Sequence, residues 1–108
     1  MNAAILSRLG ATEAQIADFC RRWRIVRFEL FGSVLRDDFD TQSDIDVLVT
    51  FEDGRKYGIS ELLDMESELK ALFGRPVDLT ERRLVETSRN WIRRRAILDS
   101  ARTLYAAA

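Results

Sequence analysis

One run of residues near the middle of the chain constrains its fold more than any other. Ile45–Phe51 (IDVLVTF) is nearly all apolar and rich in β-branched side chains. This composition is typical of a strand buried within a sheet rather than exposed at its surface. The run therefore predicts a buried central strand, even though an aspartate, Asp46, lies inside it.

Hydrophobic periodicity predicts the other elements. Residues 26–31 alternate apolar and charged side chains, which indicates a second strand. Thr12 and Gln15 form a capping-box pattern at the start of an amphipathic helix over residues 12–23. We further expect a leading helix that ends at Gly10 and helices at 59–73, around Leu84–Val85 and at about 90–101. We also expect a strand at 77–80. Tyr105 should lie on a short edge strand or against the core.

Together these elements predict an α+β fold. The strands would form a small mixed β-sheet with helices packed mainly on one face, within a single domain over residues 1–108. Trp23 and Trp91 are expected in the core or half-buried beside it. Cys20 is expected to be buried on the apolar face of its helix.

Composition excludes several kinds of site. The chain has no histidine, which rules out imidazole bases and histidine metal ligands, and its single cysteine cannot form an internal disulfide. The formal net charge is -1, whereas a protein that binds DNA through its phosphates usually has a basic excess, so DNA binding is disfavoured. Because we find no signal-peptide pattern and no apolar run of about 20 residues, we expect a cytoplasmic protein without a membrane segment.

A Gly32-Ser33 turn follows the strand predicted at 26–31. Glycine allows the backbone to approach a ligand closely, and Ser33 can cap the next helical segment, whose free N–H groups favour an anion. The turn therefore predicts a phosphate-binding site, although an ordinary strand-to-helix turn can have the same two residues. Arg36 could bind the same phosphate, or it could form a surface ion pair with a neighbouring aspartate.

Two aspartates, Asp44 and Asp46, flank Ile45 at the start of the central strand. Alternate side chains of a strand lie on the same face, so their Cα atoms should be roughly 6–7 Å apart. Like charges on one face repel, and no cation is evident beside them in the sequence, so a bound divalent ion is the natural relief. Asp78, in the strand predicted at 77–80, would complete the cluster if the two strands are neighbours. Oxygen ligands alone select Mg²⁺ or Mn²⁺, and two such ions would suit phosphate chemistry.

The stretch LFGSVLRDDFDTQSDIDVLVTF resembles the signature of the DNA polymerase beta-type nucleotidyltransferase superfamily, in which a Gly-Ser pair precedes an Asp-x-Asp pair. The short chain and its later GRPVDLT segment are similar to the minimal nucleotidyltransferases, often called MNT domains. The resemblance implies the polymerase beta-like fold. It also implies that Gly32 and Ser33 hold a triphosphate, that Asp44 and Asp46 bind metal, and that Asp78 is the later strand aspartate of the family.

These features predict a Mg²⁺-dependent nucleotidyltransferase that uses ATP. Because many members of the family are antitoxins paired with a HEPN-domain ribonuclease toxin, the resemblance implies transfer of AMP to a hydroxyl of such a toxin, encoded by a neighbouring gene, within a homo- or hetero-oligomer. The alternative is a non-catalytic antitoxin that neutralises its partner by surface contact. The three aspartates argue against the non-catalytic alternative, since a scaffold needs no repulsive acid cluster.

Three consecutive arginines, Arg93–Arg95, are either a solvated helix face or a contact for a nucleotide or partner.

Overall fold

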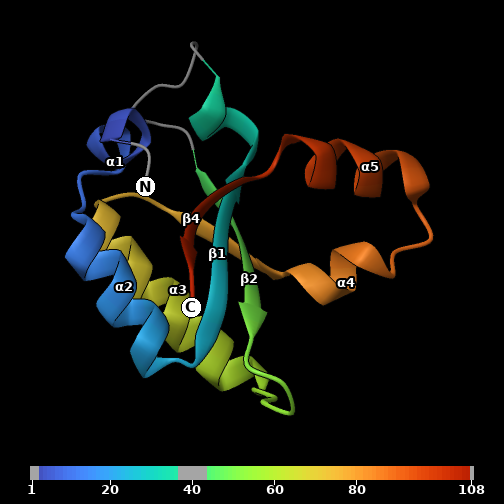
Figure 1. Ribbon diagram of the computed structural model, residues 1–108, viewed down its shortest axis with the longest axis horizontal. Helices are drawn as coiled ribbons and strands as arrows, with labels where there is room; N and C mark the ends of the chain where they lie inside the picture. Colours follow the sequence, from blue (N-terminus) through green and yellow to red (C-terminus); the bar gives the residue numbers. More distant parts are fainter. Residues whose placement is uncertain (1–2, 37–43, 108) are drawn as a thin grey trace.

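A four-stranded mixed sheet forms the centre of the computed structural model, which describes residues 3–36 and 44–107, apart from the side chains of residues 3, 4 and 33. β1 is antiparallel to both β2 and β4, whereas β2 and β3 are parallel. The mixed sheet confirms the prediction, and Tyr105 does lie on an edge strand. The assignment of residues 1–108 to a single domain stays a prediction. The strands are β1 (Ile25–Phe31), β2 (Ile45–Phe51), β3 (Val77–Glu81) and β4 (Arg102–Ala106), and Figure 1 shows them at the centre of the molecule. Their spatial order is β3-β2-β1-β4.

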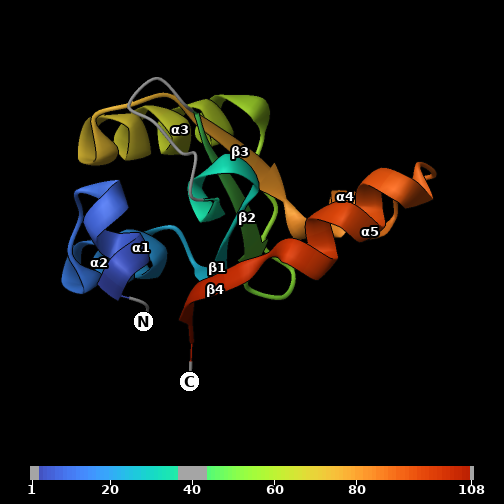
Figure 2. The same ribbon diagram turned by 90° about the horizontal axis from the view of Figure 1, so that it is seen from above.

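Three helices cover one face of the sheet and enclose the larger core. They are α1 (Ala3–Leu9), α2 (Glu13–Arg22) and α3 (Ile59–Phe73), and they lie on the same side of the strands in Figure 2. Their apolar side chains pack against alternate residues of the two central strands, because successive side chains of a strand lie on opposite faces. The strand residues of this core are Ile25, Phe28, Leu30, Ile45, Val47, Val49, Phe51 and, on β4, Leu104.

The structure confirms the predicted helix cap, the predicted end of the leading helix and the burial of two side chains. The α2 capping box is complete: the Gln15 N–H donates to Thr12 Oγ1 at 3.2 Å, and the Thr12 N–H donates to Gln15 Oε1 at 2.9 Å. The leading helix ends directly before Gly10, whose φ is 70°. Cys20 is buried and Trp23 is half-buried, as expected.

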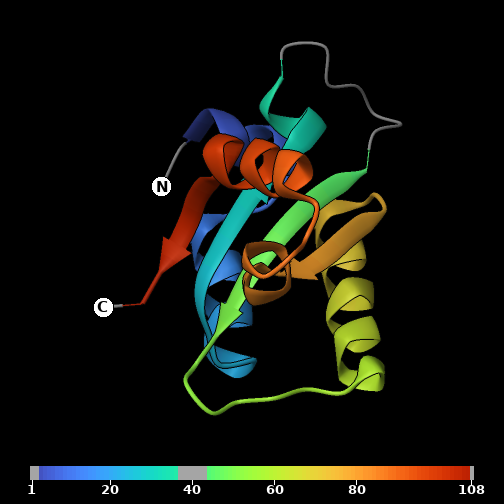
Figure 3. The same ribbon diagram turned by 90° about the vertical axis from the view of Figure 1, so that its right-hand side faces the viewer.

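Two further helices, α4 (Arg82–Glu86) and α5 (Trp91–Ser100), lie on the opposite face of the sheet. We call residues 82–100 the α4–α5 arm. In Figures 1 and 2 the arm projects away from the sheet on the side opposite α2 and α3. The helices are therefore packed mainly on one face, as predicted, while the arm covers part of the other (Figure 3). It packs on the sheet through a smaller apolar cluster made of Phe31, Leu48, Val85 and Ile97.

Two apolar residues are more exposed than their pattern indicated. Trp91 is 59% exposed at the start of α5, so the predicted core or half-core position is wrong. Ile59, the first residue of the helix predicted at 59–73, is 77% exposed. Each lies in the first turn of its helix and faces away from both apolar clusters, so helical spacing did not translate into burial.

The helices of the described part of the chain are short. The longest is α3, with 15 residues. None of them is both long and apolar enough to cross a membrane.

Candidate active site

Asp46 lies on the face of the sheet that carries the α4–α5 arm. Its neighbours in β2, Ile45 and Val47, are buried in the larger core on the opposite face. Leu48, two residues after Asp46, packs in the smaller cluster beneath the arm. Because side chains alternate along a strand, Asp46 lies on the arm side, half-buried near the amino end of β2.

Parallel pairing of β2 with β3 brings a second aspartate beside the first. Asp46 and Asp78 are direct partners across the two strands. Val77 and Leu79, on either side of Asp78, pack against the larger core, so Asp78 lies on the same face as Asp46. Asp44 directly precedes β2 and is exposed. The strand pairing on which the predicted three-aspartate cluster depended is therefore present, while the metal-binding role of these residues stays a prediction.

Gly32 lies directly against Asp46. It follows Phe31, the residue of β1 that pairs with Asp46, and its φ of 76° is in the left-handed region that favours glycine. A Cβ atom on Gly32 would lie 3.3 Å from Asp46 Cγ and closer still to Oδ2. This position therefore requires glycine both for its backbone conformation and for the space that the carboxylate fills.

The turn continues as a short 3-10 helix, η1 (Gly32–Leu35). Val34 is fully buried in the larger core and anchors η1 there. Nη1 of Arg8 donates to the carbonyl oxygens of Val34 and Arg36, at 2.8 Å each. The Ser33 side chain lies outside the described part of the chain, and Arg36 is exposed. The predicted phosphate contacts of both residues therefore stay predictions.

The negative charges of Asp44 and Asp78 act on the carboxylate of Asp46. Burial raises the pKa of Asp46, and the negative charges of Asp78 and Asp44 raise it further, whereas Arg93 on α5 lowers it. The expectation that no cation lies beside these acids is therefore wrong. In the sequence Arg93 is one of three consecutive arginines, and its approach to Asp46 follows from the way the arm folds onto the sheet. A pattern local to the aspartates could not have revealed it.

A fourth carboxylate, Glu66 of α3, lies within electrostatic range of Asp78. Burial raises the pKa of Glu66, the charge of Asp78 raises it further, and a hydrogen bond with the Leu79 backbone lowers it. No pattern in the sequence singles out Glu66, because it is one of several acids on an amphipathic helix. Its position extends the negative potential along the β3 edge of the sheet.

The donor set suits a hard divalent cation. The three aspartates offer only oxygen ligands, their mutual repulsion raises the pKa of Asp46, and Gly32 leaves space for its carboxylate. Within residues 3–36 and 44–107, no group of three or more acidic or cysteine side chains is arranged to hold an ion by itself. Mg²⁺ is usually bound by one or two carboxylates, with waters and substrate phosphates as the other ligands, so the joint binding of an ion by Asp44, Asp46 and Asp78 stays a prediction.

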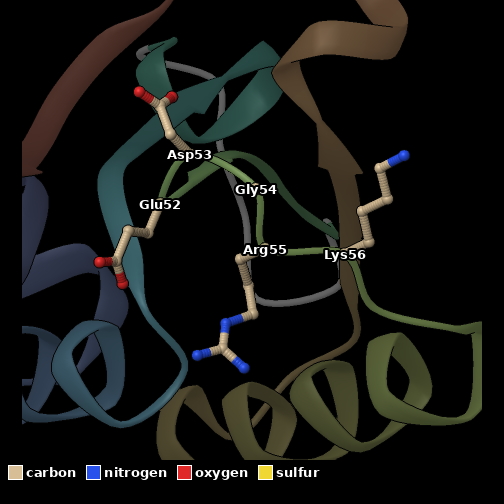
Figure 4. Close-up of a pocket in the computed structure, with 5 residues that line it drawn as sticks. All are labelled: Glu52, Asp53, Gly54, Arg55 and Lys56. Atoms are coloured by element: carbon tan, nitrogen blue, oxygen red, sulfur yellow. The ribbon is translucent and has the colours of Figure 1, made fainter.

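A surface hollow lies at the other end of β2. It is lined by residues 52–56 in the loop between β2 and α3 (Figure 4). In this view the carboxylates of Glu52 and Asp53 point away from Arg55 and Lys56, so the hollow has no convergent set of groups. Asp46 is near the opposite, amino end of the strand. The paired aspartates, rather than this loop, define the candidate active site.

Comparison with known families agrees with this geometry. Residues 13–104 match the family model described as a nucleotidyltransferase domain. The chain belongs to this family. Among solved structures it is similar to a "putative minimal nucleotidyltransferase", with 30% identity and a TM-score of 0.63 over 83% of this chain and 86% of that one. The predicted relation to the minimal nucleotidyltransferases is confirmed.

Other relatives extend the comparison. The Methanocaldococcus jannaschii protein named "Putative protein adenylyltransferase MJ1379" is 30% identical over 64 residues, which span 59% of this chain and 64% of that protein, just under two thirds of its length. A toxin–antitoxin complex with AMP-PNP is 19% identical, with a TM-score of 0.69 over 89% of this chain and 74% of that one. A Shewanella oneidensis complex of a tri-AMPylated HEPN toxin with an MNT antitoxin is 18% identical, with a TM-score of 0.60 over 88% and 70%. At these identities the two complexes show a shared fold, which confirms the predicted fold class.

Proposed function

We propose that this nucleotidyltransferase transfers AMP from ATP to a hydroxyl group of a partner protein, with Mg²⁺ as its cofactor. The observation that carries the proposal is the direct pairing of Asp46 with Asp78, with Gly32 against the Asp46 carboxylate. Carboxylates brought together in this way, without histidine or thiolate ligands, favour Mg²⁺, with Mn²⁺ as a substitute. We expect two ions, as in other phosphoryl-transfer sites.

Each residue of the candidate site has a proposed role. Gly32 would let the backbone approach the triphosphate closely, with Ser33 and Arg36 as further phosphate contacts. Asp44 and Asp46 would hold the metal ions. Asp78 would both ligate a metal and orient the acceptor hydroxyl, since it is exposed near the edge of the sheet. Cations held there would offset the negative charge that the phosphates carry during displacement.

The proposed reaction is an in-line displacement at the α-phosphorus of ATP. A bond forms between the acceptor oxygen and the α-phosphorus, and the bond from that phosphorus to the oxygen bridging to the β-phosphate breaks. AMP remains on the acceptor as a phosphodiester, and pyrophosphate leaves. The hydroxyl proton passes to a nearby carboxylate, for which Asp78 is the best placed of the three.

Similar structures suggest the kind of partner. Two of them are toxin–antitoxin complexes, and in one the HEPN toxin is tri-AMPylated. We infer that the acceptor here is also a HEPN-type toxin, encoded by a neighbouring gene. This chain would then act as the antitoxin and form a hetero-oligomer with the toxin.

The proposal is tested with ATP labelled at the α-phosphate, Mg²⁺ and the product of the adjacent gene, with label on protein as the readout. The wild-type chain should label the partner, and Asp46→Asn should reduce the rate by at least about 100-fold, the scale on which loss of one electrostatic contact to the reacting group acts. The matched control is Asp53→Asn, because Asp53 lies in the loop at the other end of β2 (Figure 4). That variant should keep the wild-type rate.

Thermal unfolding gives a second, independent readout. Mg²⁺ with ATP should raise Tm by mass action, which corresponds to about 2.7 kcal/mol when ligand is 100-fold above Kd. Asp46→Asn should abolish the rise while the unliganded variant still folds, because its burial and the acids around it already disfavour the charge. Tight partner binding by a wild-type chain that shows neither label nor a rise in Tm would favour the non-catalytic antitoxin.

A further inference from the structure

The α4–α5 arm presents large apolar side chains to solvent. Leu84 on α4 is 57% exposed, and Trp91 and Ile92 at the start of α5 are 59% and 65% exposed. The arm packs on the sheet through other residues, Val85 and Ile97. In Figures 1 and 2 it projects outward, and no other part of the described chain lies beyond it. We call the exposed surface at Leu84, Trp91 and Ile92 the outer face of the arm, and it is apolar surface that the described part of the chain does not cover.

An arginine accompanies two of these apolar residues. Residues three and four apart are neighbours on a helix surface, so Arg95 lies beside both Trp91 and Ile92. Arg95 forms an ion pair with Asp99 at 3.4 Å, but the two side chains are 76% and 71% exposed. Because an exposed ion pair contributes little free energy, Arg95 can instead pair with an acidic group of a partner protein. Tryptophan and arginine are the residue types most enriched among the energetically dominant residues of protein interfaces.

The arm is also basic within a slightly acidic chain. Residues 82–100 contain six arginines against two acids, Glu86 and Asp99, a formal charge of +4, whereas the whole chain has a net charge of -1. Arg82 and Arg83 are paired with Glu29 and Glu81 outside the arm, which leaves a formal charge of +2 on the rest of it. Among the described residues, the side chains of Arg89 and Arg93 form no hydrogen bond or ion pair, although Arg93 interacts electrostatically with Asp46. The surface around the exposed apolar residues therefore attracts acidic groups.

We propose that the outer face of the α4–α5 arm is the docking surface for the acceptor protein, and that the acceptor presents acidic side chains around an apolar pocket that receives Trp91. That the bound protein is also the acceptor of AMP rests on the proposed function. That a protein binds to the arm rests only on the surface of the arm. Complementary charge would steer the encounter, and burial of the apolar residues would stabilise the complex.

The arm places such a partner next to the candidate active site. β3, which carries Asp78, leads directly into α4. Arg93 follows Ile92 in α5 and interacts electrostatically with Asp46. A protein held on the arm would therefore lie beside the carboxylates, where its hydroxyl has to be for transfer.

Other occupants suit this surface less well. A second copy of the chain, joined by a two-fold contact through the arm, would bring two positively charged surfaces together. A nucleic acid could use the arginines and stack a base on Trp91, but it would gain little from the aliphatic Leu84 and Ile92. A folded protein uses both the apolar and the basic groups.

The experiment measures, by titration calorimetry, the affinity of the full chain for the product of the adjacent gene. Trp91→Ala should raise Kd by at least about 10-fold, as expected for an anchoring interface residue. Arg89→Glu should also raise Kd, by a factor that shrinks as salt increases. The matched control is Ile59→Ala, a comparably exposed apolar residue at the start of α3, which should stay within about twofold of wild type. The rise in Tm with Mg²⁺ and ATP should be the same in all four proteins.

Several results would overturn the docking surface. One is an unchanged Kd for Trp91→Ala, and another is the absence of binding between the wild-type chain and the product of the adjacent gene. A third is self-association of the chain that Trp91→Ala abolishes. The last is tighter binding of a single-stranded oligonucleotide than of that gene product at about 150 mM salt. Failure of the proposed reaction has a different signature. In that case Trp91→Ala weakens binding but even the wild-type chain transfers no AMP, so the docking surface stands and the reaction does not.

Discussion

A buried ion pair joins the arm to the sheet and yields our most informative stability prediction. Glu29 of β1 is only 2% exposed, and Nη1 of Arg82, the first residue of α4, lies 2.6 and 2.7 Å from its two carboxylate oxygens. Nε of Arg27 is 3.5 Å from the same carboxylate, but Arg27 is 46% exposed and its charge is screened by solvent. Burial disfavours the charged form of Arg82, yet the hydrogen bonds and charges of Glu29 and, to a smaller extent, Glu86 together outweigh burial and raise the pKa of Arg82.

Arg82→Met should destabilise the protein by about 3–5 kcal/mol, because it leaves a buried carboxylate without its main partner. The remaining contact with Arg27 favours the lower end of that range. In a domain of this size each kcal/mol shifts Tm by about 4–8 °C, so a loss of about 3 kcal/mol should lower Tm by at least about 12 °C. The double variant Glu29→Leu/Arg82→Met should recover most of the loss, because apolar groups then replace both charges.

Urea unfolding of the wild type, both single variants and the double variant gives the coupling free energy between the two residues. The matched control is Arg95→Met, whose ion pair with Asp99 is exposed and should contribute less than about 1 kcal/mol. If Arg82→Met also costs less than about 1 kcal/mol, the pair behaves like a surface pair. The reasoning from burial would then be refuted.

Three further perturbations follow from single residues. Gly32→Ala should lower Tm and reduce AMP transfer by at least about 10-fold, because the new Cβ would collide with the Asp46 carboxylate; a fully active variant would contradict the proposed site. Burial raises the pKa of Cys20 from 9.0 to about 12, so a thiol reagent at pH 8 should label only the unfolded protein. The folded state thus favours the protonated thiol, and stability should fall as pH rises from about 9 towards 12; rapid labelling of the native chain would count against this burial. Thr12→Ala should cost about 0.5–2 kcal/mol in urea unfolding, through loss of the bond from the Gln15 N–H, and no measurable change would show that the cap is not needed.

Most elements were predictable from sequence because each one carries a local signal. The helix at 59–73 and the strand at 45–51 have the same bounds in the structure as in the prediction. In both, the period of the apolar residues matches the period of the element, so type and buried face are specified together. The capping residues Thr12 and Gly10 add boundaries that do not depend on the rest of the fold.

Exposure and charge proximity were not predictable in the same way. The sequence places Trp91 and Ile92 at the start of a helix but says nothing about where the arm meets the sheet, and it is this meeting that leaves both side chains in solvent. The approach of Arg93 to Asp46 depends on the same packing. Such contacts join segments far apart in the chain, and no local period encodes them.

The pairing of Asp46 with Asp78 lies between these two cases. Val77 and Leu79 must face the larger core, so a slip of one residue along β2 would bury Asp78 there and expose both apolar side chains. The apolar pattern alone thus excludes half of the possible registers. A slip of two residues keeps the faces correct, however, and would set Asp78 beside Asp44 or Leu48 instead. In the observed register the Ile45 N–H donates to the Pro76 carbonyl at 3.0 Å, just before the paired aspartates. The apolar pattern therefore selects the face of the sheet on which the acids lie, whereas it leaves their position along the two strands open.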